Sequence, residues 1–151
     1  MASTVTPATL TVTITETITL NGSEQGATNS FTVASIAEIN KRIVDCPASE
    51  KTVLSFGAAI AAGTFVEGDV RYIRLTNKDD TNYVTLNIEG DASTDYSVRL
   101  DPGASYLIVS TSATGVVDYA DISGATLEDL TDIKATANSA ACDLEVLVAS
   151  V

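Results

Sequence analysis

The sequence has no histidine, and this absence removes several kinds of catalytic site. Ser-His-Asp and Cys-His arrangements need an imidazole as the general base, and catalytic zinc sites draw most of their ligands from histidine. Neither G-x-x-x-x-G-K-[ST] nor G-x-G-x-x-G occurs, so the chain carries no signature of a phosphate-binding loop. We therefore expect a protein that is not an enzyme and that uses no catalytic residue, metal or cofactor.

Tryptophan is also absent, and aromatic residues make up only 5% of the chain. Sites for sugars and for single-stranded nucleic acids usually stack the ligand on aromatic rings, so both are weak candidates. Basic residues are scarce, since 8 Lys and Arg stand against 20 Asp and Glu, and the net charge is -12. Such a surface repels a polyanion, so we expect no nucleic-acid partner. The charge instead favours solubility or a basic protein surface.

The chain also lacks a long apolar run, and a membrane span would need about 18 such residues. Its first residues, "MASTVTPATLTVTITET", show no basic stretch followed by an apolar core, which a secretory signal would have. We therefore expect no membrane partner. The sequence predicts a protein that acts in a cytoplasm, or that leaves it by a route other than secretion.

A length of 151 residues fits one domain that can fold without a metal or a disulfide. Residues 1–9 are uncharged and rich in Ala, Ser and Thr, so they cannot pack a core by themselves. We predict a flexible N-terminal arm over residues 1–9 and a single domain over residues 10–151. The arm would either fray or become ordered against a neighbouring molecule.

Two cysteines are present, Cys46 and Cys142. Free cysteines are commonly buried as small hydrophobic residues, and we favour that interpretation. A disulfide between them stays open, because sequence alone gives no geometry. A structural zinc site would need further nitrogen or sulfur ligands, which a chain without histidine does not supply.

Residues 9–22, "TLTVTITETITLNG", alternate apolar and polar positions, with Leu10, Val12 and Ile14 separated by threonines. This period of two predicts a half-buried strand. Similar strand-like stretches recur with turn signals between them, giving about nine or ten strands. They lie at residues 30–47, 51–59, 70–75, 83–88, 94–111 (two strands), 114–124 and 126–151 (two strands). We predict an all-β fold, an antiparallel β-sandwich or jelly-roll-like single domain, with a barrel as a further option.

Two further segments carry signals of their local conformation. Residues 36–43 show a weak helical spacing of isoleucines, but Val and Ile are abundant and Pro47 closes the segment, so we favour an extended strand. "DPG" at 101–103 is a strong turn signal, because proline presets φ and glycine accepts a positive φ.

Carboxylates are the remaining candidates for chemistry. Asp79 and Asp80 lie between two strand-like runs in "VRYIRLTNKDDTNYVTLNIEG", where a hairpin tip is expected and where Asp and Asn stabilise turns. A glycosidase pair would need two carboxyl groups facing each other across a cleft. Further acidic residues occur around 89–95 and 118–132, but without the D-x-[DN]-x-[DN]-G spacing of a calcium loop. We interpret Asp79 and Asp80 as turn residues.

Threonine is the feature that stands out. It occupies one side of the first strand, and a long, uncharged threonine face would be an aggregation hazard if it were left uncovered. Either the domain or a partner chain covers it, and we favour a partner. The candidate contact residues are Thr11, Thr13, Thr15, Thr17 and Thr19.

The stretch "VRYIRLTNKDDTNYVTLNIEG…YSVRLDPGASYLIV" resembles a pattern in small structural proteins of tailed bacteriophages, which decorate a capsid or form part of the tail. The resemblance covers residues 70–109, and "CDLEVLVASV" fits it loosely. It implies a β-sandwich or jelly-roll module and carries no active-site residue. The matching positions, with roles in holding the fold, are Arg71, Tyr72, Arg74, Asn77, Tyr83, Gly103 and Ser105.

The resemblance implies a non-enzymatic virion protein, most directly a capsid decoration or cement protein that binds the phage head lattice as a homo-oligomer, a trimer. Its partner would be the major capsid protein, or a tail protein, and its location the capsid surface after assembly in the host cytoplasm. One alternative is a tail, adaptor or fibre-base component. Another is a receptor-binding module that recognises glycans or proteins through its loops, with Tyr96, Tyr106 and Tyr119 as the aromatic candidates.

Overall fold

The computed structural model describes residues 4–91, 95–111, 119–120 and 127–151. Strands dominate these ranges, and the helical element within them is a single 3-10 turn, η1 (Glu67–Asp69). No helix in the described ranges is long and apolar enough to cross a bilayer. The predicted all-β class is confirmed.

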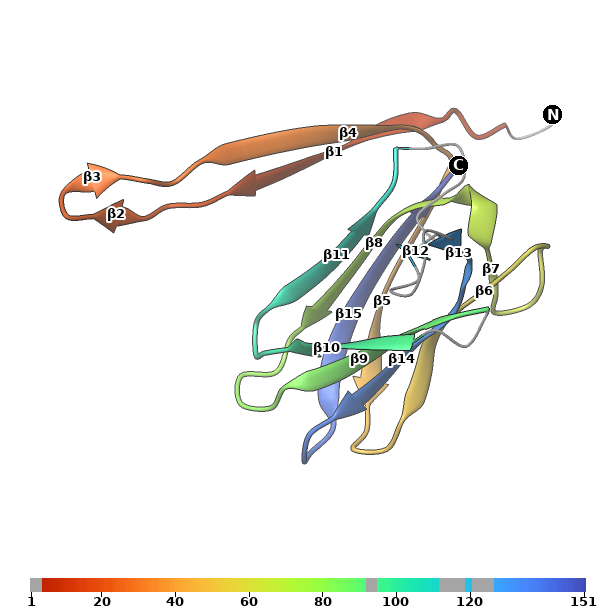
Figure 1. Cartoon of the computed structure of the whole chain (residues 1–151). Helices are drawn as coiled ribbons and strands as arrows, with labels where there is room; N and C mark the ends of the chain where they lie inside the picture. The colour runs from red at the N-terminus through yellow and green to blue at the C-terminus, as the bar shows by residue number, and fades with distance from the viewer. Residues whose placement is uncertain (1–3, 92–94, 112–118, 121–126) are drawn as a thin grey trace.

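Two sheets pack against each other as a β-sandwich (Figure 1). The four-stranded sheet has the order β11 (Ser105–Val109), β8 (Val70–Asn77), β15 (Cys142–Ser150) and β5 (Glu38–Cys46). The five-stranded sheet has the order β10 (Asp95–Leu100), β9 (Val84–Gly90), β14 (Leu130–Ala137), β6 (Lys51–Gly57) and β7 (Phe65–Val66). Neighbouring strands are antiparallel, except that β7 runs parallel to β6. The predicted antiparallel sandwich is therefore confirmed.

The core lies between the inner faces of the two sheets. Because side chains alternate along a strand, every second residue of the central strands points inward and is buried. The largest fully buried side chains are Leu54, Val70, Ile73, Leu75, Val84, Leu86, Ile88, Leu130, Ile133, Leu144 and Val146. Burying each one stabilises the fold by roughly 1.5–3 kcal/mol, so apolar burial between the sheets is the main source of stability.

A long β-hairpin at the start of the chain projects from one end of this sandwich (Figure 1). Its strands are β1 (Ala8–Thr15), paired with β4 (Thr28–Ile36), and β2 (Thr19–Leu20), paired with β3 (Ser23–Glu24). A single residue, Ala37, separates β4 from β5, so the hairpin continues directly into the four-stranded sheet. Residues 10–36, which the sequence assigned to the main domain, form most of this hairpin. Whether hairpin and sandwich are one folding unit stays a prediction, as does the flexibility of residues 1–9.

The strand predicted at 51–59 is confirmed as β6, and the extended course predicted for 30–47 is confirmed, but that segment forms two strands, β4 and β5, which lie in different sheets. The turn at "DPG" is also confirmed, since the Ala104 amide donates to the Asp101 carbonyl and Gly103 has a φ of +73°. The strand predicted within 114–124 falls mostly outside the described residues. Its described part is β12 (Tyr119–Ala120), which pairs with β13 (Leu127–Glu128).

The expectation of a hairpin over residues 70–90 is wrong. β8 and β9 lie in opposite sheets, and the segment between them crosses from one sheet to the other. A run of turn-forming residues shows where a chain reverses, but it does not decide whether the next strand pairs beside the last one. β8 lies between β11 and β15, and β9 lies between β10 and β14, so each is central in its own sheet.

Candidate interaction surface on the projecting hairpin

The register of the hairpin shifts between Ala8 and Leu10 at its base and is constant from Leu10 to the tip. Leu10 pairs with Val33, Thr15 with Thr28 and Thr19 with Glu24, so neither strand gains a residue between these pairs. In the short segment between the strand assignments, the Glu16 amide donates to the Ala27 carbonyl at 2.8 Å and the Gln25 amide to the Ile18 carbonyl at 2.8 Å. A constant register keeps even-numbered residues of β1 and β2 on one face and odd-numbered residues on the other.

The tip is closed by Asn21 and Gly22, whose φ angles are +51° and +79°. Positive φ at both central residues defines a type I′ turn, which matches the twist of the two strands and favours Asn-Gly. This dipeptide was the available sequence signal for a hairpin, and the sequence analysis did not use it.

Glu24 holds the segment behind the tip. Its Oε1 accepts hydrogen bonds from the Gly26 amide at 2.8 Å and the Ile18 amide at 3.2 Å, and its Oε2 accepts one from Thr19 Oγ1 at 3.3 Å. The bond from the Gly26 amide, then that from Ile18, lowers the pKa of the Glu24 carboxyl below its ordinary value. Gly26 is required here, because a Cβ at that position would lie 2.1 Å from the Glu16 carbonyl oxygen.

One face of the hairpin consists of hydroxyl side chains. Thr13 Oγ1 lies 3.0 Å from Ser30 Oγ, and Thr28 Oγ1 donates to Thr15 Oγ1 at 3.4 Å. All five predicted contact residues are exposed, and the register brings them to this face, together with Thr28, Ser30 and Thr32 of β4. We call this set the threonine face. The described part of the domain does not cover it, and contact with a partner stays a prediction.

The opposite face of the hairpin is apolar at its base and packs on the sandwich. Leu10, Val12, Phe31 and Val33 join a second hydrophobic cluster with Ile36 and four residues on the outer side of the four-stranded sheet. Those four are Tyr72, Leu107, Leu147 and Ala149. The base of the hairpin is therefore fixed to the sandwich by burial of apolar surface.

Further from the base, the apolar face has no cover within the described residues. Ile14 is 40% exposed, Ile18 54% and Leu20 60%. Glu16 lies between the two isoleucines on the same face, and its carboxylate makes no ion pair with the described residues. We call Ile14, Glu16 and Ile18 the arm stripe. The sequence interpretation considered the two isoleucines only as part of the apolar side of a half-buried strand.

The loop after β8 confirms the turn role of Asp79. Its Oδ1 accepts hydrogen bonds from the Asn82 amide and, at 2.8 Å, from the Thr81 amide, and these bonds lower the pKa of its carboxyl. Asp80 Oδ1 accepts a hydrogen bond from Thr81 Oγ1 at 2.9 Å. Both carboxylates are therefore occupied by the turn itself, and they do not face each other across a cleft.

Asn77 is the buried polar residue that joins the two sheet-crossing loops. Its Nδ2 donates to the carbonyl oxygens of Asn82 at 2.8 Å and Leu100 at 3.1 Å, and its Oδ1 accepts from the Asp79 amide at 3.0 Å. Its backbone bonds the loop after β10, through Ala104 and Gly103. The fold-holding role that the resemblance implied for Asn77 agrees with these contacts.

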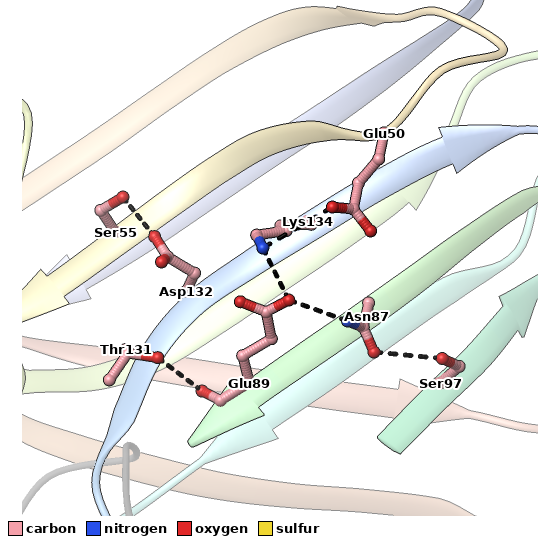
Figure 2. A network of polar contacts seen from close by, with 8 residues as sticks. All are labelled: Glu50, Ser55, Asn87, Glu89, Ser97, Thr131, Asp132 and Lys134. Carbon is pink, nitrogen blue, oxygen red and sulfur yellow. Dashed lines mark hydrogen bonds and ion pairs between the residues drawn. The ribbon is translucent and has the colours of Figure 1, made fainter. Parts of the chain in front are cut away.

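A second polar group lies on the outer side of the five-stranded sheet (Figure 2). Lys134 Nζ lies 2.8 Å from Glu89 Oε1 and 3.6 Å from Glu50 Oε1, and Asn87 Nδ2 donates to Glu89 Oε1 at 3.0 Å. The hydrogen bond to Glu89 raises the pKa of Lys134, so its amine stays protonated at neutral pH and cannot act as a base. This group lines neither the cavity beside Ile60 and Phe65 nor the cavity beside Val33 and Arg71. We interpret it as a set of cross-strand contacts that stabilise the sheet.

Cys46 and Cys142 are buried free thiols on directly opposite positions of β5 and β15. Burial raises the pKa of Cys46 to about 11 and also raises that of Cys142. The interpretation as buried hydrophobic residues is confirmed. Among the described residues, no group of three or more His, Cys, Asp or Glu side chains could hold a metal ion.

The geometry thus offers one feature that the stability of the sandwich does not explain, the projecting hairpin with two uncovered surfaces. No protein-family model matches the sequence, and neither does any of the curated proteins compared with it.

Proposed function

We propose that this chain is a non-enzymatic structural protein of a phage particle, a decoration or cement protein that binds the capsid lattice as an oligomer through its projecting hairpin. The single observation that supports this function best is the threonine face, a long and exposed surface of hydroxyl side chains on an arm that extends beyond the sandwich. The resemblance of residues 70–109 to structural proteins of tailed phages supplies the virion context.

The threonine face has properties that suit contact with another protein. Threonine is β-branched and loses little side-chain freedom when it is held at an interface. Its hydroxyl can exchange a bond to water for a bond to a partner's backbone, so few polar atoms are left unpaired. The only charge on this face among the described residues of the hairpin is the Glu24 carboxylate beside Thr19, so burying the part between Thr11 and Thr17 desolvates no charge and avoids that large cost.

An isolated two-stranded hairpin is only marginally stable in water. The outer half of this hairpin has neither a third strand nor a covering layer within the described residues. A capsid surface that covered the threonine face would stabilise the arm and gain buried area at the same time. Many copies on one particle would add their effects, because each contact helps to hold the same lattice.

Binding to purified phage particles tests the proposal. The chain is incubated with expanded heads and, separately, with purified tails of the phage that encodes it, and bound protein is measured after sedimentation. Thr13→Glu and Thr17→Glu, on the threonine face, are expected to weaken binding to heads by at least about tenfold, because a charge would be buried. Thr52→Glu makes the same change on an exposed position of β6 and is expected to leave binding unchanged.

Each other outcome argues against the decoration role. Binding to tails instead of heads would assign the chain to the tail, adaptor or fibre-base group. Binding to neither particle, with clear binding to a glycan array in the presence of calcium, would indicate a receptor-binding module. Equal loss in all three variants would show that charge in general, and not the threonine face, determines binding.

A further inference from the structure

The outer side of the four-stranded sheet carries an exposed stripe that no described residue covers. Ile39, Lys41 and Ile43 alternate along β5 with residues that face inward, and Ile39 is 61% and Ile43 63% exposed. β5 is an edge strand, hydrogen-bonded only to β15 within the described chain. We call Ile39, Lys41 and Ile43 the β5 stripe. Large apolar residues alternating on an exposed edge strand mark a contact site.

The arm stripe and the β5 stripe are complementary in sequence and charge. Each has two isoleucines spaced four residues apart, with Glu16 at the centre of one and Lys41 at the centre of the other. Because successive same-face residues are about 7 Å apart in any strand, the three positions of one stripe match those of the other. The pattern is symmetric about its centre, so Glu16 meets Lys41 whether the two strands run parallel or antiparallel.

The charge distribution of the chain favours this pairing. Residues 1–40 contain Glu16, Glu24 and Glu38 but no Lys or Arg, and Lys41 is the first basic residue of the sequence. Lys41 Nζ lies 3.2 Å from Glu145 Oε2, and its side chain is still 57% exposed. Glu145 is also paired with Arg74, so Glu145 keeps a cationic partner while Lys41 accepts a second carboxylate.

The hairpin already packs on this kind of surface within its own chain. Its base lies on the outer side of the four-stranded sheet, against Tyr72, Leu107, Leu147 and Ala149. The arm stripe continues the same apolar face outward, away from its own sandwich (Figure 1). The β5 stripe belongs to the same outer sheet surface, next to Leu147 and Ala149 in the register of β5 and β15.

We infer that the arm stripe of one copy packs on the β5 stripe of a second copy, so that arms are exchanged between neighbouring molecules. Ile14 and Ile18 bury against Ile39 and Ile43, and Glu16 forms an ion pair with Lys41. The arm of each molecule contacts one neighbour, and its β5 stripe is contacted by the arm of a neighbour. A reciprocal pair therefore contains two such contacts, and a ring contains one for each molecule. The threonine face stays available for another partner, and the inference does not depend on the proposed virion role.

Sedimentation equilibrium of the full chain measures the dissociation constant of self-association. Ile18→Lys, on the arm stripe, is expected to raise it by at least about tenfold, since a charge would replace a buried isoleucine. Ile60→Lys is the matched control, because Ile60 is 92% exposed and belongs to neither stripe. A wild-type chain that stays monomeric up to about 100 µM, which corresponds to negligible affinity, would overturn the inference. So would an equal effect of the two variants.

A charge exchange tests the specific ion pair and the exchange between molecules. Glu16→Lys alone and Lys41→Glu alone place like charges opposite each other, and each is expected to weaken self-association. A mixture of the two variants restores opposite charges on both contacts of a pair. Tagged Glu16→Lys chain should therefore capture untagged Lys41→Glu chain, but not untagged Glu16→Lys chain. Equal capture of the two untagged variants would contradict the pairing. Capture of neither untagged variant would also contradict it, provided that both variants retain the circular dichroism spectrum of the wild type.

Discussion

The sandwich and the hairpin use the same kinds of residue but are stabilised differently. In the sandwich, central strands such as β9 and β15 have a neighbour on each side, and their inner residues are fully buried. In the hairpin, among the residues that the structure describes, each strand has one neighbour and only the base contacts another layer. The difference teaches that alternating Val, Ile and Thr specifies a strand, while the layers around the strand decide how stable it is.

The largest contrast is expected from removing an apolar side chain in each region. Leu86 is fully buried in β9, so Leu86→Ala should lower the free energy of unfolding by about 3 kcal/mol through lost burial and a cavity. Ile18→Ala, on the exposed arm, should change it by less than about 0.5 kcal/mol. Urea denaturation followed by circular dichroism measures both. Similar losses would mean that the hairpin is part of the cooperative core.

Replacing an asparagine by alanine should show the same contrast between sandwich and hairpin, with a smaller loss of free energy of unfolding. Asn77→Ala removes the partners of the Asn82 and Leu100 carbonyls and of the Asp79 amide, all near buried residues. We expect a loss of roughly 2 kcal/mol, because buried polar groups would be left unsatisfied. Asn29→Ala, on an exposed position of β4, should cost little. Unfolding midpoints of the two variants should therefore differ clearly, and equal midpoints would remove Asn77 as the link between the loops.

A glycine substitution should affect the hairpin alone. Gly26→Ala would place a methyl group against the Glu16 carbonyl, so the segment behind the tip has to open. Hydrogen exchange at the Glu16 and Gln25 amides should become at least about tenfold faster, with little change in the sandwich amides. Gly68→Ala is the control, since no atom lies within 4 Å of a Cβ there. Equally faster exchange at the sandwich amides would argue against a separate hairpin.

The smallest effect is expected from protonating Glu24. Its pKa is lowered in the folded chain, so its contribution is present above the ordinary pKa of a glutamate and is lost as the pH falls through the lower, folded value. The amide resonance of Gly26 should move as the pH falls, with a midpoint below the ordinary range for glutamate. In Glu24→Ala this movement should be absent. A midpoint at or above that range would contradict the hydrogen bonds from Gly26 and Ile18.

The sequence predicted the strands well and their arrangement less well. The alternation of Leu10, Val12 and Ile14 identified a strand, and the turn residues Asp79 and Gly103 marked two chain reversals. The alternation could not show that the strands within residues 8–36 pair with each other to form a hairpin, because a strand in a hairpin and a strand in a sandwich share the same period. Similarly, Asn77 and Asp79 indicate a turn, but only contacts distant in the sequence place β8 and β9 in opposite sheets.

The candidate surface was predicted in part. The five threonines were identified from their spacing, and they do lie exposed on one face, although their partner is untested. The exposed isoleucines of the arm were missed, because an apolar residue in an alternating pattern is normally buried. Burial is decided by the second layer, and nothing in the local sequence tells where that layer ends.

The constant register of the hairpin has a consequence for spacing. From Leu10 to Leu20 the arm reaches about 35 Å, so any molecule held at its tip lies at a set distance from the sandwich. Adding two residues to each strand would lengthen that reach by about 7 Å and leave both faces oriented as before. Adding one residue to each strand would exchange the positions of the threonine face and the apolar face beyond the insertion. The arm therefore fixes the distance between its tip and the sandwich, and it keeps the orientation of its two faces only if it is lengthened in steps of two residues.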